Sequence, residues 1–390
     1  MNLSKLKGYS FAIFYLIYFA GMGGFMPFIN QYLQTNLGLT GSQLGIFTFT
    51  TLIIAVFIVP IWGVIGDKTG KYKLLLLISL GLSIAAAFFY SIQTGYIAVI
   101  ASGIILEVVR SGIISLSDVQ AMNYTSTHHG NYGFIRSMGS LGYVIGSLLV
   151  GAVVSENDYS PVFTVYISIL LLSLVIAFTF PKTDIKQETS KNKNSGSVKD
   201  VLKNKHFLFI VLASLLTTIL MDSANGYAGI HMVNTLGGNA SSAGKFTFAT
   251  ALPEIILLGI IGKWFSKYGY KKIYLLNAAV LVVRYIIYAI APNNFVFLIA
   301  SLVHCIGTGI ATVGNLGYLK VVIGKENYGT AVTLMNAGFA VGRAIYSLIF
   351  GYMLDWFGSS SIFIFSAVGM FIALIMIMKT SMFKIIDENA

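Results

Sequence analysis

Charged side chains that can pair with one another lie inside the long apolar runs of this chain. Four carboxylates and all four arginines of the sequence do so: Glu107, Asp118, Asp222 and Glu254, and Arg110, Arg136, Arg284 and Arg343. An isolated charge in apolar surroundings is costly, whereas a guanidinium can bind a carboxylate through two parallel hydrogen bonds. The equal numbers predict ion pairs. For Asp222 with Arg343, a pair that only locks two helices together is as good an interpretation as a functional one.

In the first half of the chain, residue spacing predicts one polar cluster. Asp118 and Arg136 each lie nine residues from position 127, where the chain turns, and nine residues of helix span about 13 Å. If the two runs are antiparallel helices, both side chains lie at the same depth. Glu107 precedes Asp118 by eleven residues, about three helical turns. The two carboxylates therefore share a face, with Arg110 next to them.

In the second half, the same argument predicts a second cluster. Glu254 and Arg284 are each fifteen residues from Gly269, and Arg284 and His304 are each ten residues from Asn294. Gly269 and Asn294 mark turns, so the three ionisable side chains lie at one level. A histidine beside an arginine and a carboxylate can take part in proton transfer, because imidazole titrates near neutral pH. We therefore expect Glu254, Arg284 and His304 to act together.

The elements that must position these residues are membrane-spanning helices. The 390 residues are 56% hydrophobic and 10% charged, whereas a globular chain carries about 25% charged residues. A helix needs roughly 20 mainly apolar residues to cross a bilayer. Twelve such runs begin near Phe11, Leu44, Leu74, Ala98, Tyr132, Val162, Phe207, Gly244, Ile273, Phe295, Gly329 and Ile362. The predicted fold is an all-α integral membrane protein with twelve transmembrane helices.

The net charge of +11 is explained by the orientation of these helices. If the N and C termini are cytoplasmic, nearly every lysine falls in a cytoplasmic loop, and Lys245 is the exception. This is the positive-inside bias that orients membrane proteins. We therefore expect a multi-pass protein that lies in the lipid bilayer of the plasma membrane and binds no nucleic acid.

A hydrophilic stretch divides the twelve runs into six and six. It predicts an N-terminal six-helix bundle over 1–180, a flexible cytoplasmic linker over 181–205 and a C-terminal six-helix bundle over 206–390. The two halves also repeat one another. Gly63, Asp67, Lys68, Gly70 and Lys73 recur 199 residues later as Gly262, Ser266, Lys267, Gly269 and Lys272.

The segment from Gly63 to Lys73 resembles the loop motif between the second and third spans of the major facilitator superfamily (MFS). This resemblance implies the MFS fold, in which two pseudo-symmetric six-helix bundles hold a substrate site near the membrane midplane. It assigns a gating role to five residues: Gly63, Asp67, Lys68, Gly70 and Lys73. The glycines would let helix ends approach closely, and Asp67 would pair with a neighbouring helix end.

The whole chain resembles the lactose-permease group of oligosaccharide/proton symporters, and it is also similar to the phenylpropionate permeases. The carboxylate eighteen residues before an arginine, Asp118 and Arg136, looks like the group's signature in its fourth and fifth spans. The resemblance implies that this pair binds sugar hydroxyls and that Tyr143 stacks on the sugar ring. It likewise assigns Glu254 and His304 to substrate binding.

One position departs from the lactose-permease pattern. That permease carries its proton-coupling glutamate three residues after the histidine, where this chain has Gly307, and the phenylpropionate permeases share this lack and the His304-Cys305 pair. We hypothesise that another group carries the proton, with Glu254, Asp118 or the Glu107/Arg110 pair as candidates. Proton-coupling or ion-pairing roles are expected for Glu107, Arg110, Asp222, Glu254, Arg284, His304 and Arg343.

Together these features predict proton-coupled uptake of a small polar organic solute, a sugar or oligosaccharide before any other. The alternatives are uptake of aromatic acids or nucleosides, and MFS efflux of drugs or metabolites. The fifth span lacks the Gly-Pro signature of efflux antiporters. The sequence has no phosphate-binding loop, no zinc-ligand spacing and one cysteine, Cys305, so we expect no enzymatic activity, no cofactor and no metal. We expect the protein to function as a monomer.

Overall fold

The structure is a computed structural model that describes residues 3–128, 130–181, 197–258 and 260–383. Over these residues the chain forms helices joined by short loops, and eleven helical spans are long and apolar enough to cross a membrane. The span predicted near Gly244 is divided into two shorter helices, α13 (Ser242–Leu258) and α14 (Ile261–Tyr268). The predicted all-α membrane architecture is confirmed.

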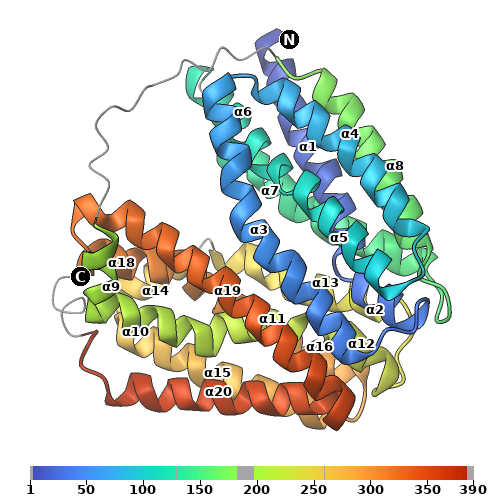
Figure 1. Ribbon diagram of the computed structural model, residues 1–390. Helices are drawn as coiled ribbons and strands as arrows, with labels where there is room; N and C mark the ends of the chain where they lie inside the picture. The colour runs from blue at the N-terminus through green and yellow to red at the C-terminus, as the bar shows by residue number, and fades with distance from the viewer. Residues whose placement is uncertain (1–2, 129, 182–196, 259, 384–390) are drawn as a thin grey trace. The chain divides into compact units, whose positions relative to one another are not determined.

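The first compact unit holds the described parts of residues 1–189 together with residues 239–247. Its complete helices are α1 (Leu3–Phe25), α2 (Ile29–Thr35), α3 (Gly41–Thr69), α4 (Tyr72–Ser91), α5 (Tyr96–Arg110), α6 (Gly112–Thr127), α7 (Tyr132–Val153) and α8 (Pro161–Phe178). They run side by side as a bundle, coloured blue to green in Figure 1. Helix α1 packs along α7 and α8, and α4 packs against α5, α6 and α8.

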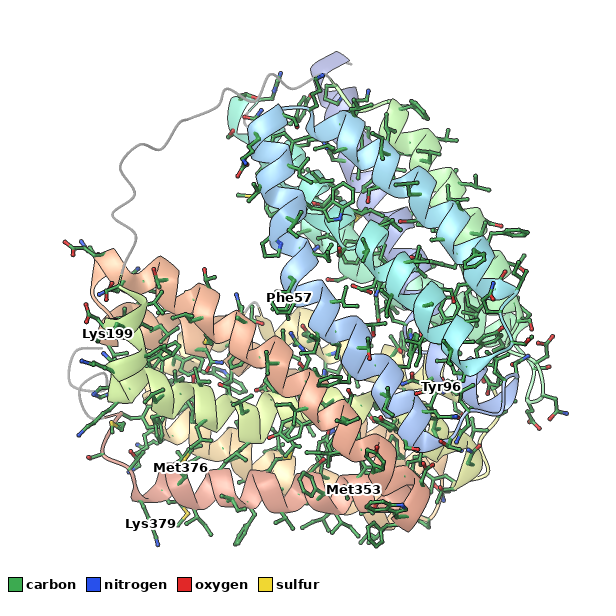
Figure 2. All side chains as sticks on the ribbon, in the orientation of Figure 1. Phe57, Tyr96, Lys199, Met353, Met376 and Lys379 are labelled. Atoms are coloured by element: carbon green, nitrogen blue, oxygen red, sulfur yellow. The ribbon has the colours of Figure 1, made fainter. Side chains whose placement is uncertain are left out.

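The second compact unit holds the described parts of residues 190–238 and 248–390, including most of α13 and all of α14. Its other elements are α9 (Val198–Lys203), α10 (Lys205–Ser214), η1 (Leu215–Ile219), α11 (Leu220–Asn225), α12 (Ala228–Asn234), α15 (Tyr270–Ile290), α16 (Asn294–Ser301), α17 (His304–Gly309), η2 (Ile310–Gly314), α18 (Asn315–Val322), α19 (Lys325–Phe357) and α20 (Ser359–Lys379). The segments η1 and η2 are π-helical. Figure 2 shows Lys199 and Lys379 at one end of this unit, with both side chains pointing outward.

The predicted linker is described only in part. Residues 182–196 lie outside the described residues. The end of the predicted linker is not extended chain, because Val198–Lys203 form the helix α9. Ser197 caps this helix, since its side chain accepts a hydrogen bond from the backbone N–H of Asp200. The flexible-linker prediction is therefore wrong for these six residues, which carry a helix signal of their own.

The same helix pairings recur in the two units, in agreement with an internal repeat. In the first unit α1 packs on α7 and α4 packs on α8, and in the second α11 packs on α19 and α15 packs on α20. Lys73, near the start of α4, donates to the carbonyls of Phe178 and Phe180 at 2.8 and 2.7 Å. Lys271, near the start of α15, donates to the Thr380 carbonyl at 2.9 Å. In both units a lysine satisfies carbonyls that a helix end leaves without partners.

These caps correct the pairing of the two loops. The structural counterpart of Lys73 is Lys271 rather than Lys272, because the second loop is one residue shorter. Gly70 and Gly269 do correspond, since each directly follows the end of a helix and has a positive φ, +64° for Gly70 and +78° for Gly269. Glycine adopts this conformation without strain. At Gly63 and Gly70 the expected close helix approach is wrong, because a Cβ there would meet no described atom within 4 Å. Gly70 is required by its backbone conformation instead.

Close helix approach occurs between α1 and α7. A Cβ added at Gly146 would lie 1.8 Å from the Ala20 carbonyl oxygen, and one at Gly142 would lie 2.0 Å from the Leu16 carbonyl oxygen. A Cβ at Gly23 would lie 1.9 Å from the carbonyl oxygen of Tyr143. Small residues let membrane helices pack backbone to backbone in this way. This contact positions the polar side chains that α1 and α7 carry.

Replacement of Gly146 by alanine should separate α1 from α7 and lower the stability of the protein by about 1–3 kcal/mol, the usual range for overpacking. The matched control is Gly81→Ala on α4, where an added Cβ would meet nothing within 4 Å. That change should be neutral or stabilising by about 0.5–1 kcal/mol, because alanine favours a helix over glycine. Thermal unfolding in detergent measures both, and equal stabilities of the two variants would contradict the packing.

Candidate functional site

Asp118, on α6, is held by tyrosine hydroxyls. The hydroxyls of Tyr15 and Tyr132 both donate to Asp118 Oδ1, the second over 2.8 Å. Among the described residues, no ion pair joins Asp118 to Arg136. The predicted direct pair is therefore wrong, because α1 places Tyr15 against the carboxylate. Two hydroxyl donors to one carboxylate are strong, charge-assisted hydrogen bonds.

Arg136, on α7, lies over an aromatic ring instead. Its guanidinium carbon is 4.9 Å from the centre of the Phe19 ring, a cation–π contact. Phe19 stacks in turn on Tyr15, with 5.8 Å between ring centres. Asp118 and Arg136 are thus connected through two aromatic side chains of α1, and the Arg136 side chain is exposed. We call Tyr15, Phe19, Asp118, Tyr132 and Arg136 the Asp118 cluster.

Glu107 and Arg110 form a second group in the first unit. They are one helical turn apart at the end of α5, and Arg110 Nη2 donates to Glu107 Oε2. Their side chains keep only 12% and 15% of their accessible surface. The other Arg110 nitrogen, Nη1, lies 3.5 Å from Met22 Sδ. The single cluster predicted for this half is therefore divided in two, although both groups contact α1.

Tyr143 belongs to the second of these groups. Its hydroxyl interacts electrostatically with Arg110, as do the hydroxyls of Tyr18 and Tyr166. Tyr143 follows Arg136 by seven residues, which is two turns or about 10 Å along α7. It therefore lies at the level of Arg110, and the ring against Arg136 is Phe19. We call Glu107, Arg110, Tyr18, Tyr143 and Tyr166 the Glu107 cluster.

Arg284 is the centre of the cluster in the second unit, and only 1% of it is exposed. Its Nε and Nη2 atoms both donate to the Tyr288 hydroxyl, at 3.0 and 2.5 Å. Its Nη1 atom lies 3.2 Å from His304 Nδ1. The rings of Tyr285 and Tyr288 lie beside the guanidinium, with centres 5.4 and 4.8 Å from its carbon. The structure brings Arg284 and His304 together, as their spacing predicts.

The neighbours of His304 determine where its proton lies. Its Nδ1 atom faces Arg284 Nη1 at 3.2 Å and Asn225 Nδ2 at 3.4 Å. The Asn225 amide is oriented by the Tyr285 hydroxyl, which donates to Asn225 Oδ1 over 3.1 Å. A guanidinium has no acceptor, so Nδ1 must accept and therefore carries no proton. A doubly protonated His304 would have to move away from Arg284.

Asp222 and Glu254 are the two carboxylates that the sequence analysis singles out in the second unit. Asp222 Oδ2 is 3.6 Å from Arg343 Nη1, and Asp222 also interacts electrostatically with Arg284. Glu254 forms its hydrogen bond with the Thr308 side chain and lies within electrostatic range of Asp222. The predicted Asp222–Arg343 pair is thus present. Among the described residues, Glu254 forms no hydrogen bond or ion pair with Arg284 or His304, and its partner Thr308 lies one helical turn beyond His304.

Irregular helix surrounds this cluster. The π-helix η1 ends three residues before Asp222, and η2 begins two residues after Thr308. Such π-helical turns are rare and are frequent at functional sites. Between them, a Cβ at Gly307 would lie 2.7 Å from Met221 Sδ. A side chain at position 307 would therefore require the Met221 thioether to shift.

Sequence reasoning missed the neutral partners of these charges. The hydroxyl of Tyr15, the ring of Phe19 and the amide of Asn225 come from helices distant in sequence from the charges they contact, and no spacing rule indicates them. Tyr132 precedes Arg136 by four residues on α7, so residue spacing could have indicated it. Tyr288 was accessible to sequence reasoning, because it follows Arg284 by four residues and therefore lies on the same helix face. Within the described ranges, no three His, Cys, Asp or Glu side chains gather as metal ligands would.

Comparison with known proteins places the chain among transporters. The sequence profile of the MFS_1 like family matches residues 9–365. The chain is similar to the maltose permease of Geobacillus stearothermophilus, with 25% identity over 359 residues that cover 92% of this chain and 90% of the permease. It is also similar to a probable 3-phenylpropionic acid transporter of Escherichia coli (strain K12), with 23% identity over 92% of this chain and 94% of that protein.

Solved structures agree with the fold. The crystal structure of the nucleoside transporter NupG matches with a TM-score of 0.83, covering 98% of this chain and all of that chain, at 14% identity. An identity this low supports a shared architecture only. Both comparisons therefore agree on a twelve-helix transporter fold.

The two ion pairs should differ in their energetic coupling. Because the Glu107–Arg110 pair is largely buried, Glu107→Ala leaves an uncompensated charge and should cost about 3–5 kcal/mol. Removing both partners should cost less than the sum of the two single changes. The Asp222–Arg343 pair is longer, with 3.6 Å between Oδ2 and Nη1, so its coupling should be smaller. Double-mutant cycles on thermal unfolding measure both couplings, and additive effects at Glu107 and Arg110 would contradict the buried pair.

Proposed function

Because the chain belongs to the MFS_1 like family of multi-pass membrane transporters, which are not enzymes, we propose that it takes up a small polar organic solute together with protons. A sugar or oligosaccharide is the first candidate. The resemblance to a maltose permease over nine-tenths of both chains supports this choice.

The Asp118 cluster carries the proposal. An exposed guanidinium over the Phe19 ring, joined through Tyr15 to a carboxylate, offers an aromatic face beside charged hydrogen-bonding groups. A sugar requires this combination, because its ring faces are apolar and its rim is lined with hydroxyls. Asp118 and Arg136 would hold hydroxyls, and Phe19 would stack on the ring. Tyr143, two turns along α7, would contact a larger solute.

The second unit would supply the remaining contacts. Glu254 and His304 would bind the solute, and Arg284 would hold His304 in its neutral form. The Asp222–Arg343 pair would hold the helices around η1. Protonation of one carboxylate would remove a charge and shift the equilibrium between conformations of the loaded transporter. The segment Gly63, Asp67, Lys68, Gly70 and Lys73 would serve the gate at the proposed cytoplasmic end.

The proposed topology follows from the lysines. Both termini are cytoplasmic in this proposal, the protein lies in the plasma membrane, and a monomer is sufficient. Residues 1–180 and 206–390 would act as the two moving bundles, joined by the linker over 181–205. The helical end of that linker, α9, exposes Lys199 and Lys203, as expected of a segment at the cytoplasmic face.

A second solute class is favoured by the other relatives. A probable 3-phenylpropionic acid transporter and a nucleoside transporter resemble the chain over more than nine-tenths of its length. Arg136 over Phe19 would suit an aromatic acid through its carboxylate, and a nucleoside through its base and ribose. The identity of the solute therefore has to be determined by measuring uptake of several candidate solutes.

Proteoliposomes with an alkaline lumen should accumulate one labelled solute from a panel of maltose, other disaccharides, nucleosides and 3-phenylpropionate. Accumulation should disappear with a protonophore. Arg136→Gln should weaken uptake at low solute concentration by roughly 10- to 100-fold, since one charged hydrogen-bonding group is worth about 1.5–3 kcal/mol.

The matched control is Lys263→Gln, which removes an exposed positive charge on α14 and should leave uptake unchanged. Accumulation that needs an acidic lumen instead would indicate efflux and contradict the proposed direction. Uptake that the protonophore does not reduce would contradict proton coupling.

A further inference from the structure

Two buried tyrosine hydroxyls near Glu107 have no hydrogen-bond partner in the described part of the chain. Tyr166 and Tyr90 are each 1% exposed, and neither hydroxyl is hydrogen-bonded to any residue that the structure describes. An unpaired buried hydroxyl costs about 1–3 kcal/mol, so such groups in proteins are normally served by water. Two of them beside one ion pair indicate a place where mobile protons can be exchanged.

The tyrosines lead from the Glu107 cluster toward one end of the first unit. The Tyr166 hydroxyl interacts electrostatically with both Arg110 and Glu107, and the Tyr90 hydroxyl interacts with Arg110 and with Tyr32. The rings of Tyr32 and Tyr90 both pack on Phe163, with centres 4.9 and 5.1 Å from its ring centre. The hydroxyls of α2, α4 and α8 thus follow one another toward the loop between α7 and α8.

An ionised carboxylate lies at the end of this line. Asp158, in the α7–α8 loop, interacts electrostatically with Tyr32 and is exposed. It accepts hydrogen bonds from the Ser160 backbone N–H at 2.8 Å and from Asn36 Nδ2 at 2.9 Å. These bonds lower the pKa of Asp158, so it stays charged at neutral pH. Under the proposed topology this loop is extracellular, where a symporter takes up its protons.

The other candidate carboxylates lack such a line. Asp118 already accepts hydrogen bonds from two tyrosines, and Glu254 is hydrogen-bonded to Thr308. The tyrosine hydroxyls that interact with the Glu107–Arg110 pair come from four helices: Tyr18 on α1, Tyr90 on α4, Tyr143 on α7 and Tyr166 on α8. Apart from the pair itself, all of these are neutral hydroxyls that can both accept and donate a proton.

We propose that Glu107 carries the coupled proton and that Tyr166, Tyr90 and Tyr32, with the water they bind, conduct it inward from Asp158. Each hydroxyl accepts one proton from the outer side and donates its own toward Glu107, so no hydroxyl gains or loses a proton overall. Protonated Glu107 loses its charge and releases Arg110, whose guanidinium turns to the Tyr18 and Tyr166 hydroxyls. This inference rests on the proton-coupled uptake proposed above.

The test is solute-driven proton entry into proteoliposomes that contain a pH-sensitive dye, followed together with exchange of labelled solute. Glu107→Gln should reduce proton entry by roughly 100-fold, the scale of a positioned acid–base group, while solute exchange continues. Tyr166→Phe and Tyr90→Phe should slow proton entry several-fold without changing the Kd for the solute. These two variants keep the ring packing, so they report on the hydroxyls even if Glu107→Gln folds poorly.

The matched control is Tyr159→Phe. The Tyr159 hydroxyl is also buried and unpaired among the described residues, but its electrostatic neighbour is Glu156 rather than the Glu107 cluster. Its loss should leave proton entry unchanged. Normal proton entry in Tyr166→Phe and Tyr90→Phe would overturn the proposal. A higher Kd for the solute with proton coupling intact would also overturn it and would assign these hydroxyls to solute binding. Absence of proton entry in the unmodified protein would instead contradict the proposed function itself.

Discussion

The cost of placing charged groups among apolar helices governs the arrangement of this protein. Each charge in a span needs a partner that remains in place as the helices move. The chain meets this need largely with neutral hydroxyls. Asp118 is held by two tyrosines, and Arg284 by Tyr288 with His304 beside it. Hydroxyl partners stabilise a charge without neutralising it, so the charge can still act on a solute.

Helix packing serves the same end. The glycine contacts between α1 and α7 bring backbones together, and this closeness lets Tyr15 and Phe19 reach side chains on α6 and α7. In the second unit the π-helices η1 and η2 are placed on either side of the Arg284 cluster. Rigid contacts in one unit and irregular helix in the other are two ways of setting polar groups at a defined depth. A transporter needs both helix contacts that stay fixed and helix segments that rearrange during transport.

Sequence analysis predicted the membrane fold, because hydropathy is a local property of the chain. It also predicted that Arg284 and His304 meet, since equal distances from a turn fix depth in antiparallel helices. It failed where the partner was neutral and distant. Asp118 accepts hydrogen bonds from Tyr15 and Tyr132 rather than pairing with Arg136. Equal depth on two helices does not show which side chain of a third helix, here α1, reaches the carboxylate. The closeness of the Met221 thioether to Gly307 was likewise invisible without coordinates.

The central claim is that solute and proton cross together. It can be tested most directly by recording current from proteoliposomes on a solid-supported membrane when a neutral solute from the panel is added without any ion gradient. Coupled transport predicts a transient current that carries positive charge into the vesicles. Its amplitude should rise with solute concentration and reach a plateau at high concentration. Exchange of labelled solute without any current would contradict the claim and would make the protein a carrier that follows the solute gradient alone.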